Sequence, residues 1–307
     1  MSSTDTSILK SIGLDLVRTT ASVVLQTLFI VSYTFLVVKA VNILLRARKM
    51  YTVGKAFAAN TIIVVTMYII TVSLWIIGLV ELLAEARKTL IDSPDQSLQV
   101  KNASTSEFTS KGAEVIDVLY AYLTLLGDLV IVWRVRAFWV LGRWKLAMIL
   151  PVALLLGTLT TSVVLTYCVV DLGGDIVNGS FQKPVFCRNM QTASYTLPAV
   201  TTAVTTILIG MKAWSHYQNS VIRKRTRISH IVTLLLESGL VYFLFFIAQI
   251  VLTVPSVSIP IEASPGLSLS TLMFSYQTSS IVGMYPTAII CLVHSRHSMA
   301  ETSYYSV

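Results

Sequence analysis

Charged residues are scarce in this chain. Lys, Arg, Asp and Glu together make up 12% of its 307 residues, whereas 54% are hydrophobic and the mean hydropathy is +0.74. Soluble globular domains typically carry about 25% charged residues. The shortage of charge therefore excludes an ordinary soluble domain and favours a protein that is embedded in lipid.

Motifs of catalysis and of cofactor binding are also missing. The sequence has no phosphate-binding glycine loop, no Gly-x-Ser-x-Gly elbow and no paired-cysteine motif. A seven-helix zinc hydrolase needs histidines at membrane depth, but all four histidines fall in segments that we expect to be cytoplasmic. We therefore expect no enzymatic activity, no cofactor and no metal site at His216, His230, His294 or His297.

What the chain does contain is a series of apolar stretches, each about 20 residues long, which is the length that an α-helix needs to cross a bilayer. Backbone groups in hydrocarbon must be satisfied within their own segment, so stretches of this length predict helices and not strands. We expect an all-α, polytopic seven-transmembrane-helix bundle. Its helices should cover Ala21–Leu44, Phe57–Val80, Val115–Val135, Leu146–Val170, Ala193–Met211, Ile231–Val254 and Ser270–Val293.

The basic residues predict the orientation of this bundle. Most of the 23 Lys and Arg residues flank the first, third and fifth connections and the tail, and the positive-inside rule places that side in the cytoplasm. The amino terminus is then outside and the carboxyl terminus is cytoplasmic. We expect an extracytoplasmic segment at 1–20, a membrane domain at 21–293 and a short tail at 294–307, without a cleavable signal peptide. The most basic connection contains Arg223, Lys224, Arg225 and Arg227.

That basic connection has two interpretations. It is either a surface that attracts anionic lipid or a docking site for an acidic cytoplasmic signalling partner. Binding to nucleic acid is not expected, because the basic residues flank membrane helices.

Sequons and cysteines agree with this topology. The two Asn-x-Ser/Thr acceptors, Asn102 and Asn178, both fall in connections assigned to the outside, which predicts a glycoprotein of the plasma membrane or another secretory-pathway membrane. Cys168 and Cys187 lie on the same side, where thiols are oxidised, and we expect them to form a disulfide. The alternative is two free thiols. Cys291, near the inner end of the seventh stretch, is expected to fill space in the core; the alternative is a site of S-palmitoylation.

Two carboxylates lie at membrane depth, which is costly unless they face the bundle interior and find partners. Asp128 in the third stretch and Glu237 in the sixth are predicted to lie at similar depth near the cytoplasmic side. Such groups form either a two-state latch or a packing node that fixes helix register without switching. The predicted inner polar cluster comprises Asn60, Asp128, Arg134 and Glu237, beside the Tyr285-Pro286 motif of the seventh stretch.

A polar stripe continues outward from Asp128 through Thr124 to Asp117 on the third stretch. Hydroxyl residues on two other stretches, which ordinary helix packing in membranes would also explain, are candidates to complete an outer polar cavity. These residues are Thr202, Thr206, Ser268, Thr271, Ser275 and Ser279.

Several short motifs resemble a set of uncharacterised seven-helix membrane proteins from basidiomycete fungi, over roughly the third to the seventh stretch. The resemblance implies a fold broadly similar to that of seven-helix receptors and no assigned biochemistry. The motifs are Gly127-Asp128 with Trp133-Arg134 and Trp139, Glu237-Ser238-Gly239 with Tyr242, and Gly283-Met284-Tyr285-Pro286-Thr287 with Ile289-Ile290.

Better-known seven-helix families fit less well. The seventh stretch contains no lysine, so a retinal Schiff base is excluded. The acid-Arg-aromatic triplet of rhodopsin-like receptors is missing, since the third stretch ends Trp133-Arg134-Val135-Arg136. Two hypotheses remain. One is a receptor-like protein that senses an unknown small-molecule or lipid ligand, and the other is a transporter or lipid-handling protein that uses Asp128 and Glu237.

The orientation can be tested with epitope tags at the two ends of the chain. In intact cells the amino-terminal tag should be accessible to antibody and the carboxyl-terminal tag should not, because an odd number of crossings separates them. Detection of both tags in the same compartment would contradict the predicted topology.

Glycosylation can be tested by electrophoresis of sequon variants. Loss of an electrophoretic shift in Asn102→Gln or Asn178→Gln would show which sequon carries a sugar.

Overall fold

The computed structural model describes residues 3–50, 54–91, 98–139, 145–172, 185–219, 225–254, 257, 260–261 and 264–302. Within these ranges the chain is helical and contains no β-strand. A short 3₁₀ helix, η1, covers Lys145–Met148. The long helices are α1 (Ser3–Met50), α2 (Gly54–Leu90), α3 (Leu98–Trp139), α4 (Ile149–Leu172), α5 (Val185–Asn219), α6 (Arg225–Thr253) and α8 (Pro265–Thr302). The all-α prediction is confirmed.

Five of these helices, α1 to α5, are long and apolar enough to cross a membrane, and α6 adds a shorter apolar segment, Leu236–Leu252. Helix α8 is not among these helices, and it contains hydroxyl and amide residues such as Thr278, Ser279 and Gln277. Large apolar side chains face outward, for example Phe35 at 74% exposure and Val170 at 80%. Such surfaces are unfavourable in water and favourable in lipid, so the structure indicates a membrane-embedded protein.

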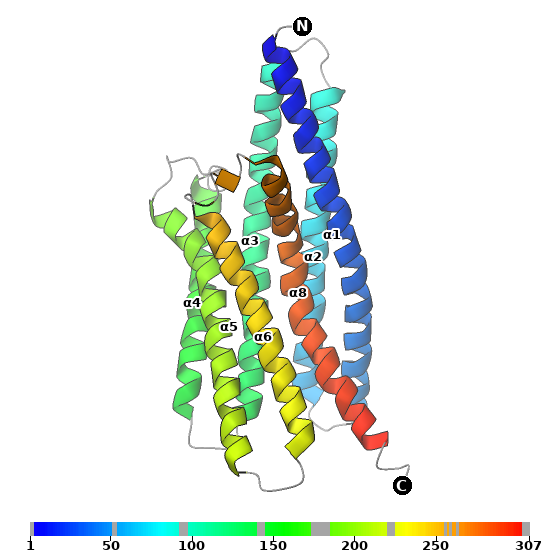
Figure 1. Ribbon diagram of the computed structural model, residues 1–307, viewed down its shortest axis with the longest axis vertical. Coiled ribbons are helices and arrows are strands. Elements are labelled where there is room, and N and C mark those ends of the chain that lie inside the picture. The colour runs from blue at the N-terminus through cyan, green and yellow to red at the C-terminus, as the bar shows by residue number, and fades with distance from the viewer. Residues whose placement is uncertain are drawn as a thin grey trace.

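Consecutive helices run in opposite directions and pack side by side, and α8 closes the bundle against α1 (Figure 1). We call the end at which α1 begins the N-end and the end at which α8 finishes the C-end. Helix α3 packs against α2, α4, α5 and α8. Half of its most apolar segment is buried, against 28% for α1, α2 and α4, so α3 is the central helix.

Several helices extend beyond the stretches expected from the sequence. Helix α1 runs without interruption through the boundary expected at residue 20, and α8 runs through that expected at 293. The connection between the second and third stretches is mostly helical, since α2 continues to Leu90 and α3 begins at Leu98. As Figure 1 shows, α1, α2 and α3 project at the N-end beyond the other helices.

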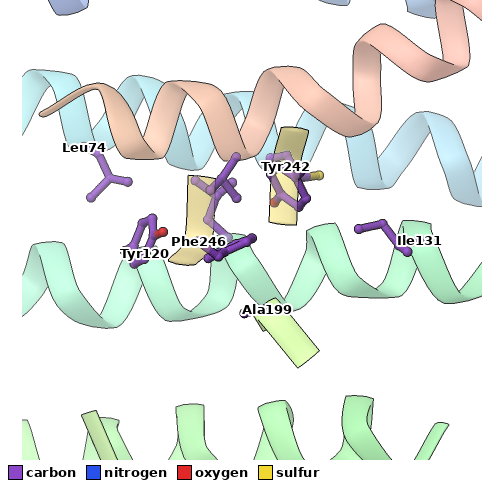
Figure 2. Packing of buried hydrophobic residues seen from close by; sticks show 9 residues of the cluster. Leu74, Tyr120, Ile131, Ala199, Tyr242 and Phe246 are labelled. Atoms are coloured by element: carbon purple, nitrogen blue, oxygen red, sulfur yellow. The ribbon is translucent and has the colours of Figure 1, made fainter. Parts of the chain in front are cut away.

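Aromatic and aliphatic side chains fill the centre of the bundle (Figure 2). Tyr242 and Phe246 of α6 pack edge to face with their ring centroids 4.9 Å apart. Burial of large apolar side chains together with aromatic contacts fixes how the helices pack. The buried cluster consists of Met67, Leu74, Tyr120, Leu123, Ile131, Ala199, Tyr242, Phe246 and Val282.

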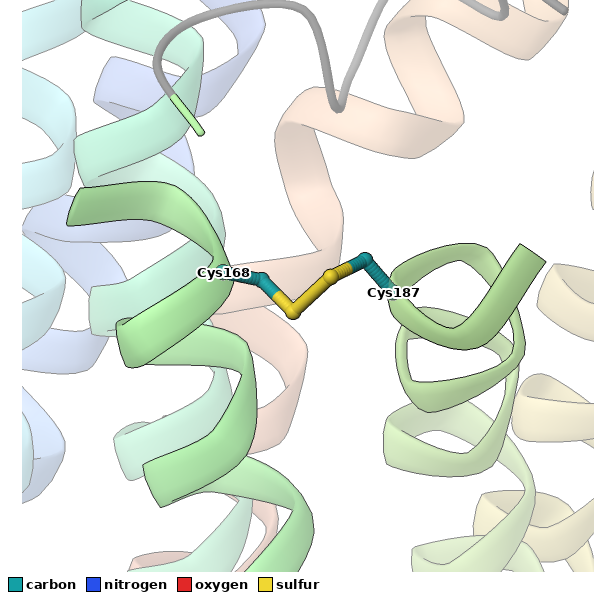
Figure 3. The surroundings of a disulfide bond; sticks show 2 residues. All are labelled: Cys168 and Cys187. Atoms are coloured by element: carbon teal, nitrogen blue, oxygen red, sulfur yellow. A yellow bond between two sulfur atoms is a disulfide. The ribbon is translucent and has the colours of Figure 1, made fainter. Parts of the chain in front are cut away.

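The disulfide expected from the sequence is present between Cys168 of α4 and Cys187 of α5, with an S–S distance of 2.01 Å (Figure 3). Both cysteines are buried, and they pack with Val169, Val118 and Val164 near the N-end. The bond therefore ties the end of α4 to the start of α5.

Two glycines allow helices to approach closely. A Cβ on Gly283 of α8 would lie 2.9 Å from Oγ1 of Thr71 and 2.9 Å from Cε1 of Tyr33. A Cβ on Gly239 of α6 would lie 2.5 Å from Oγ1 of Thr206 on α5. Small residues at such crossings are characteristic of helix packing in membranes.

We predict that Gly283→Ala lowers the free energy of unfolding by about 1–3 kcal/mol, because the added methyl group forces α8 away from α1 and α2. Thermal melting of the purified protein measures this change. Gly266→Ala is the matched control, because a Cβ at Gly266 meets no atom within 4 Å and should change stability by no more than about 0.5 kcal/mol. Equal melting temperatures for the two variants would contradict the close crossing.

Candidate functional site

Asp128 on α3 is the most deeply buried acidic side chain among the described residues, with 1% exposure. Thr158 Oγ1 of α4 donates a hydrogen bond to Asp128 Oδ2 at 3.1 Å. The same hydroxyl also lies 3.1 Å from the carbonyl oxygen of Leu154, so its one proton is shared between two acceptors. Asp128 thus connects α3 to α4.

Arg134 connects α3 to α8. Its guanidinium is buried, with 9% exposure for the residue, and Nη2 donates to the carbonyl oxygen of Pro286 at 2.7 Å. A proline inside a helix lacks the N–H that would bond the carbonyl four residues earlier, and it weakens the helix locally. Arg134 therefore binds α8 at the proline that weakens this helix.

An aromatic pair beside this contact joins α6 to α8. The rings of Tyr242 and Tyr285 stack with centroids 4.0 Å apart and an interplanar angle of 8°. A Cβ on Gly127, the neighbour of Asp128, would lie 3.6 Å from the Tyr242 hydroxyl, so this pair packs against α3. Arg134 and the aromatic pair hold α3, α6 and α8 together toward the C-end.

The prediction that Glu237 belongs to the inner polar cluster is wrong. Its side chain is exposed on α6, whereas Tyr242 on the same helix is buried. Five residues at 100° per residue place Glu237 about 140° from Tyr242, on the outer face. Ser238 lies only about 40° from Tyr242 on that count, and its hydroxyl interacts with the phenol of Tyr285. The polar residue that α6 turns inward at this depth is Ser238.

Asn60 of α2 is buried, with 5% exposure. No hydrogen bond between it and Asp128 or Arg134 occurs in the part of the chain that the structure describes. Asp128 and Arg134 also point to different helices, because six residues turn α3 by about 240°. The structure thus resolves the expected cluster into two separate contacts, one to α4 and one to α8.

Toward the N-end, α3 carries further polar contacts that the sequence only partly indicated. Gln191 Nε2 of α5 donates to Asp117 Oδ2 at 3.0 Å, and the Tyr120 hydroxyl donates to Gln249 Oε1 of α6 at 2.9 Å. Asp117 belongs to the predicted polar stripe. Its partner and the Tyr120–Gln249 pair were not predicted, because a Gln or Tyr within an apolar stretch gives no signal of which helix it faces.

A cavity of about 400 Å³ opens between α1, α6 and α8 toward the N-end. Its charged group is the ion pair between Arg18 and Asp15 of α1, with 3.6 Å between Arg18 Nη1 and Asp15 Oδ1. Three of the hydroxyl residues predicted to line a cavity do so, but they face α1 and not Thr202 and Thr206. The lining consists of Asp15, Arg18, Thr19, Leu252, Ile261, Ser268, Thr271, Leu272 and Ser275.

The remaining predicted residues do not line this cavity. Thr202 and Ser279 are buried, and Cys291 is a buried free thiol whose Sγ contacts the carbonyl oxygen of Leu36 at 3.6 Å. Asn102 lies on α3, and Asn178 is outside the described residues. Arg223 and Lys224 are also outside them, and α6 begins at Arg225 and continues through Arg227. Nothing in the structure tests the sugars or the basic connection.

The described residues contain no group of three or more His, Cys, Asp and Glu side chains that could hold a metal ion. No protein-family model, no curated protein and no solved structure matches this chain. Two features of the structure therefore bear on function. One is the central helix α3 with its polar contacts to neighbouring helices, and the other is the cavity that α8 lines.

We predict that Arg134→Gln lowers the free energy of unfolding by about 1.5–3 kcal/mol, the usual contribution of a buried hydrogen bond from a charged group. Thermal melting in detergent measures the loss. Arg136→Gln is the control, since Arg136 is exposed on the same helix and its removal should shift stability by no more than about 0.5 kcal/mol. Equal destabilisation by the two variants would show that the Pro286 contact contributes nothing specific.

Proposed function

We propose that the chain crosses the membrane seven times, with the N-end outside and the C-end in the cytoplasm. The alternation of the seven helices supports this (Figure 1). The distribution of Lys and Arg in the sequence supports the orientation. In this arrangement the cavity with Arg18 opens toward the outer surface, and Arg134 lies toward the cytoplasm.

The proposed function is that of a receptor-like sensor in a secretory-pathway membrane. One observation carries it: α8 lines the outer cavity through Ser275 and is bound by Arg134 at Pro286. These two places are about 16 Å apart along the helix axis. A ligand that shifts the start of α8 changes the strain at Pro286, where the helix is weakest.

The lining of the cavity indicates the chemistry of the ligand. Its volume lies within the roughly 300–1,000 Å³ of small-molecule sites. Arg18 and Asp15 present charges of both signs, hydroxyl groups of α8 add hydrogen-bonding capacity, and Leu252 and Leu272 provide apolar contacts. A small zwitterion with an apolar part complements all three features.

The transporter hypothesis has less support. It required Asp128 and Glu237 on one path, and the exposed Glu237 does not face the bundle interior. The fungal family resemblance and a cytoplasmic partner for the Arg223–Arg227 connection remain predictions. Uptake measurements with Asp128→Asn test transport directly, because unchanged flux would remove Asp128 from any pathway.

The sensor is tested by screening small zwitterions, including betaines, amino acids and lysophospholipids, for a rise in melting temperature of the full chain in nanodiscs. Arg18→Gln should weaken the binding of a hit about tenfold or more, since it removes a charge-assisted contact. Lys10→Gln, an exposed charge on the same helix, should leave affinity unchanged. A hit that binds both variants equally would exclude the cavity as its site.

The coupling of ligand binding in the cavity to movement at the C-end is measured with two spin labels. They are attached at exposed positions, Trp214→Cys on α5 and Leu292→Cys on α8, in a Cys291→Ala background. A hit should change the distance between the labels, and Arg134→Gln should reduce that change. A ligand that binds without moving the labels would argue against sensing through α8.

A further inference from the structure

Four buried side-chain oxygens on α1 and α8 have no hydrogen-bond partner within the described part of the chain. One of them, the Tyr33 hydroxyl, lies nearer the C-end, beside Gly283. The other three are Gln26 Oε1, Gln277 Oε1 and Ser280 Oγ. The exposures of these residues are 3%, 4% and 0%. An unpaired buried polar atom costs about 1–3 kcal/mol, so three on one pair of helices require an explanation.

The register of the two helices places the residues that carry these oxygens at neighbouring levels. Helices α1 and α8 run parallel, and two contacts between them have the same sequence offset of 255: Gln277 Nε2 to the carbonyl oxygen of Ser22, and Cys291 Sγ to that of Leu36. A constant offset places Gln26 at the level of Ile281, directly beside Ser280. Gln277 lies one turn nearer the N-end. We call Ser22, Gln26, Gln277 and Ser280 the α1–α8 seam.

Helix α2 lies against this seam at a glycine, which has no side chain to donate a hydrogen bond. It presents Gly78, where a Cβ would lie 3.9 Å from Gln26 Oε1 and 3.6 Å from Tyr276 Cε1. Gln277 Nε2 donates one of its two N–H groups to the carbonyl oxygen of Ser22. The unpaired atoms of the seam are two amide carbonyl oxygens and one hydroxyl oxygen, each of which can accept a hydrogen bond or bind a cation.

Carboxyl groups lie near the N-end of the seam. One turn above Gly78, Glu81 has a buried Oε1 that also lacks a hydrogen-bond partner and that lies against Gly112 of α3. Glu85 follows on α2, and Asp15 lies on α1. The nearby cation Arg18 is paired with Asp15. The local field thus favours a cation at the neutral oxygens below.

We propose that the α1–α8 seam binds a hydrated monovalent cation, with sodium as the physiological candidate. Carbonyl and hydroxyl oxygens are ligands for hard cations. The seam itself contains no carboxylate, so it lacks the anionic ligands with which proteins usually hold Ca²⁺. Bound water completes the coordination. This site is separate from the cavity lined by Arg18, and the inference stands whether or not the chain is a sensor.

The test measures the melting temperature of the purified full chain in NaCl, KCl and N-methyl-D-glucamine chloride at equal ionic strength. Sodium at 150 mM should raise the melting temperature by about 3 °C or more over N-methyl-D-glucamine, because a ligand that binds only the folded state stabilises it. Binding of radioactive sodium to the same preparation should saturate.

Ser280→Ala is the decisive variant, because it removes one unpaired oxygen and no hydrogen bond. It should reduce the sodium-dependent shift by at least half, and Gln26→Leu should do the same. Ser279→Ala, also buried and adjacent on α8, is the matched control and should keep the full shift. The wild-type salt comparison needs neither variant to fold.

Several outcomes would overturn the proposal. Equal melting temperatures in the three salts would mean that ordered water alone satisfies the oxygens. A sodium shift that survives in both Ser280→Ala and Gln26→Leu would place the ion elsewhere. An increase in stability of Ser280→Ala in every salt would show that the hydroxyl is only an unpaired packing group.

Discussion

The structure depends on the rule that a polar group in hydrocarbon must find its partner inside the protein. Helix α3 shows how the chain meets this rule. As the most buried of the five long apolar helices α1 to α5, it carries Asp117, Asp128 and Arg134, and two of the contacts that they make reach α4 and α8. Since α3 touches most of the other helices, these contacts also decide how the bundle is assembled.

Helix α8 has the complementary role. It is rich in hydroxyl and amide residues, and it borders both the cavity near Arg18 and the Arg134 contact at Pro286. Its close crossing at Gly283 packs it against α1 and α2, while stacking of Tyr285 on Tyr242 links it to α6. Helix α8 therefore connects the cavity at the N-end with the Arg134 contact toward the C-end.

Apolar length and cysteine placement were sufficient to predict the helical class and the Cys168–Cys187 disulfide. The side-chain partners were harder to predict. Glu237 and Ser238 are adjacent in sequence, yet only the second faces Tyr285, because 100° of rotation separates inside from outside. Apolar length placed the end of the second stretch at Val80 and the start of the third at Val115, but α2 continues to Leu90 and α3 begins at Leu98. A helix need not end where its apolar segment ends, because its backbone hydrogen bonds are internal. The seam at Gln26 and Ser280 depends on the register of α1 against α8, which no local pattern contains.

The disulfide has a mechanical consequence. Because Cys168 and Cys187 lie where α4 ends and α5 begins, the covalent bond clamps these two helices at the N-end, and the Asp128–Thr158 contact attaches α4 to α3 farther along. While this bond is intact, α4 and α5 cannot separate at the N-end. Rearrangement of the bundle is left to helices that only packing and hydrogen bonds hold in the described part of the chain, such as α6 and α8.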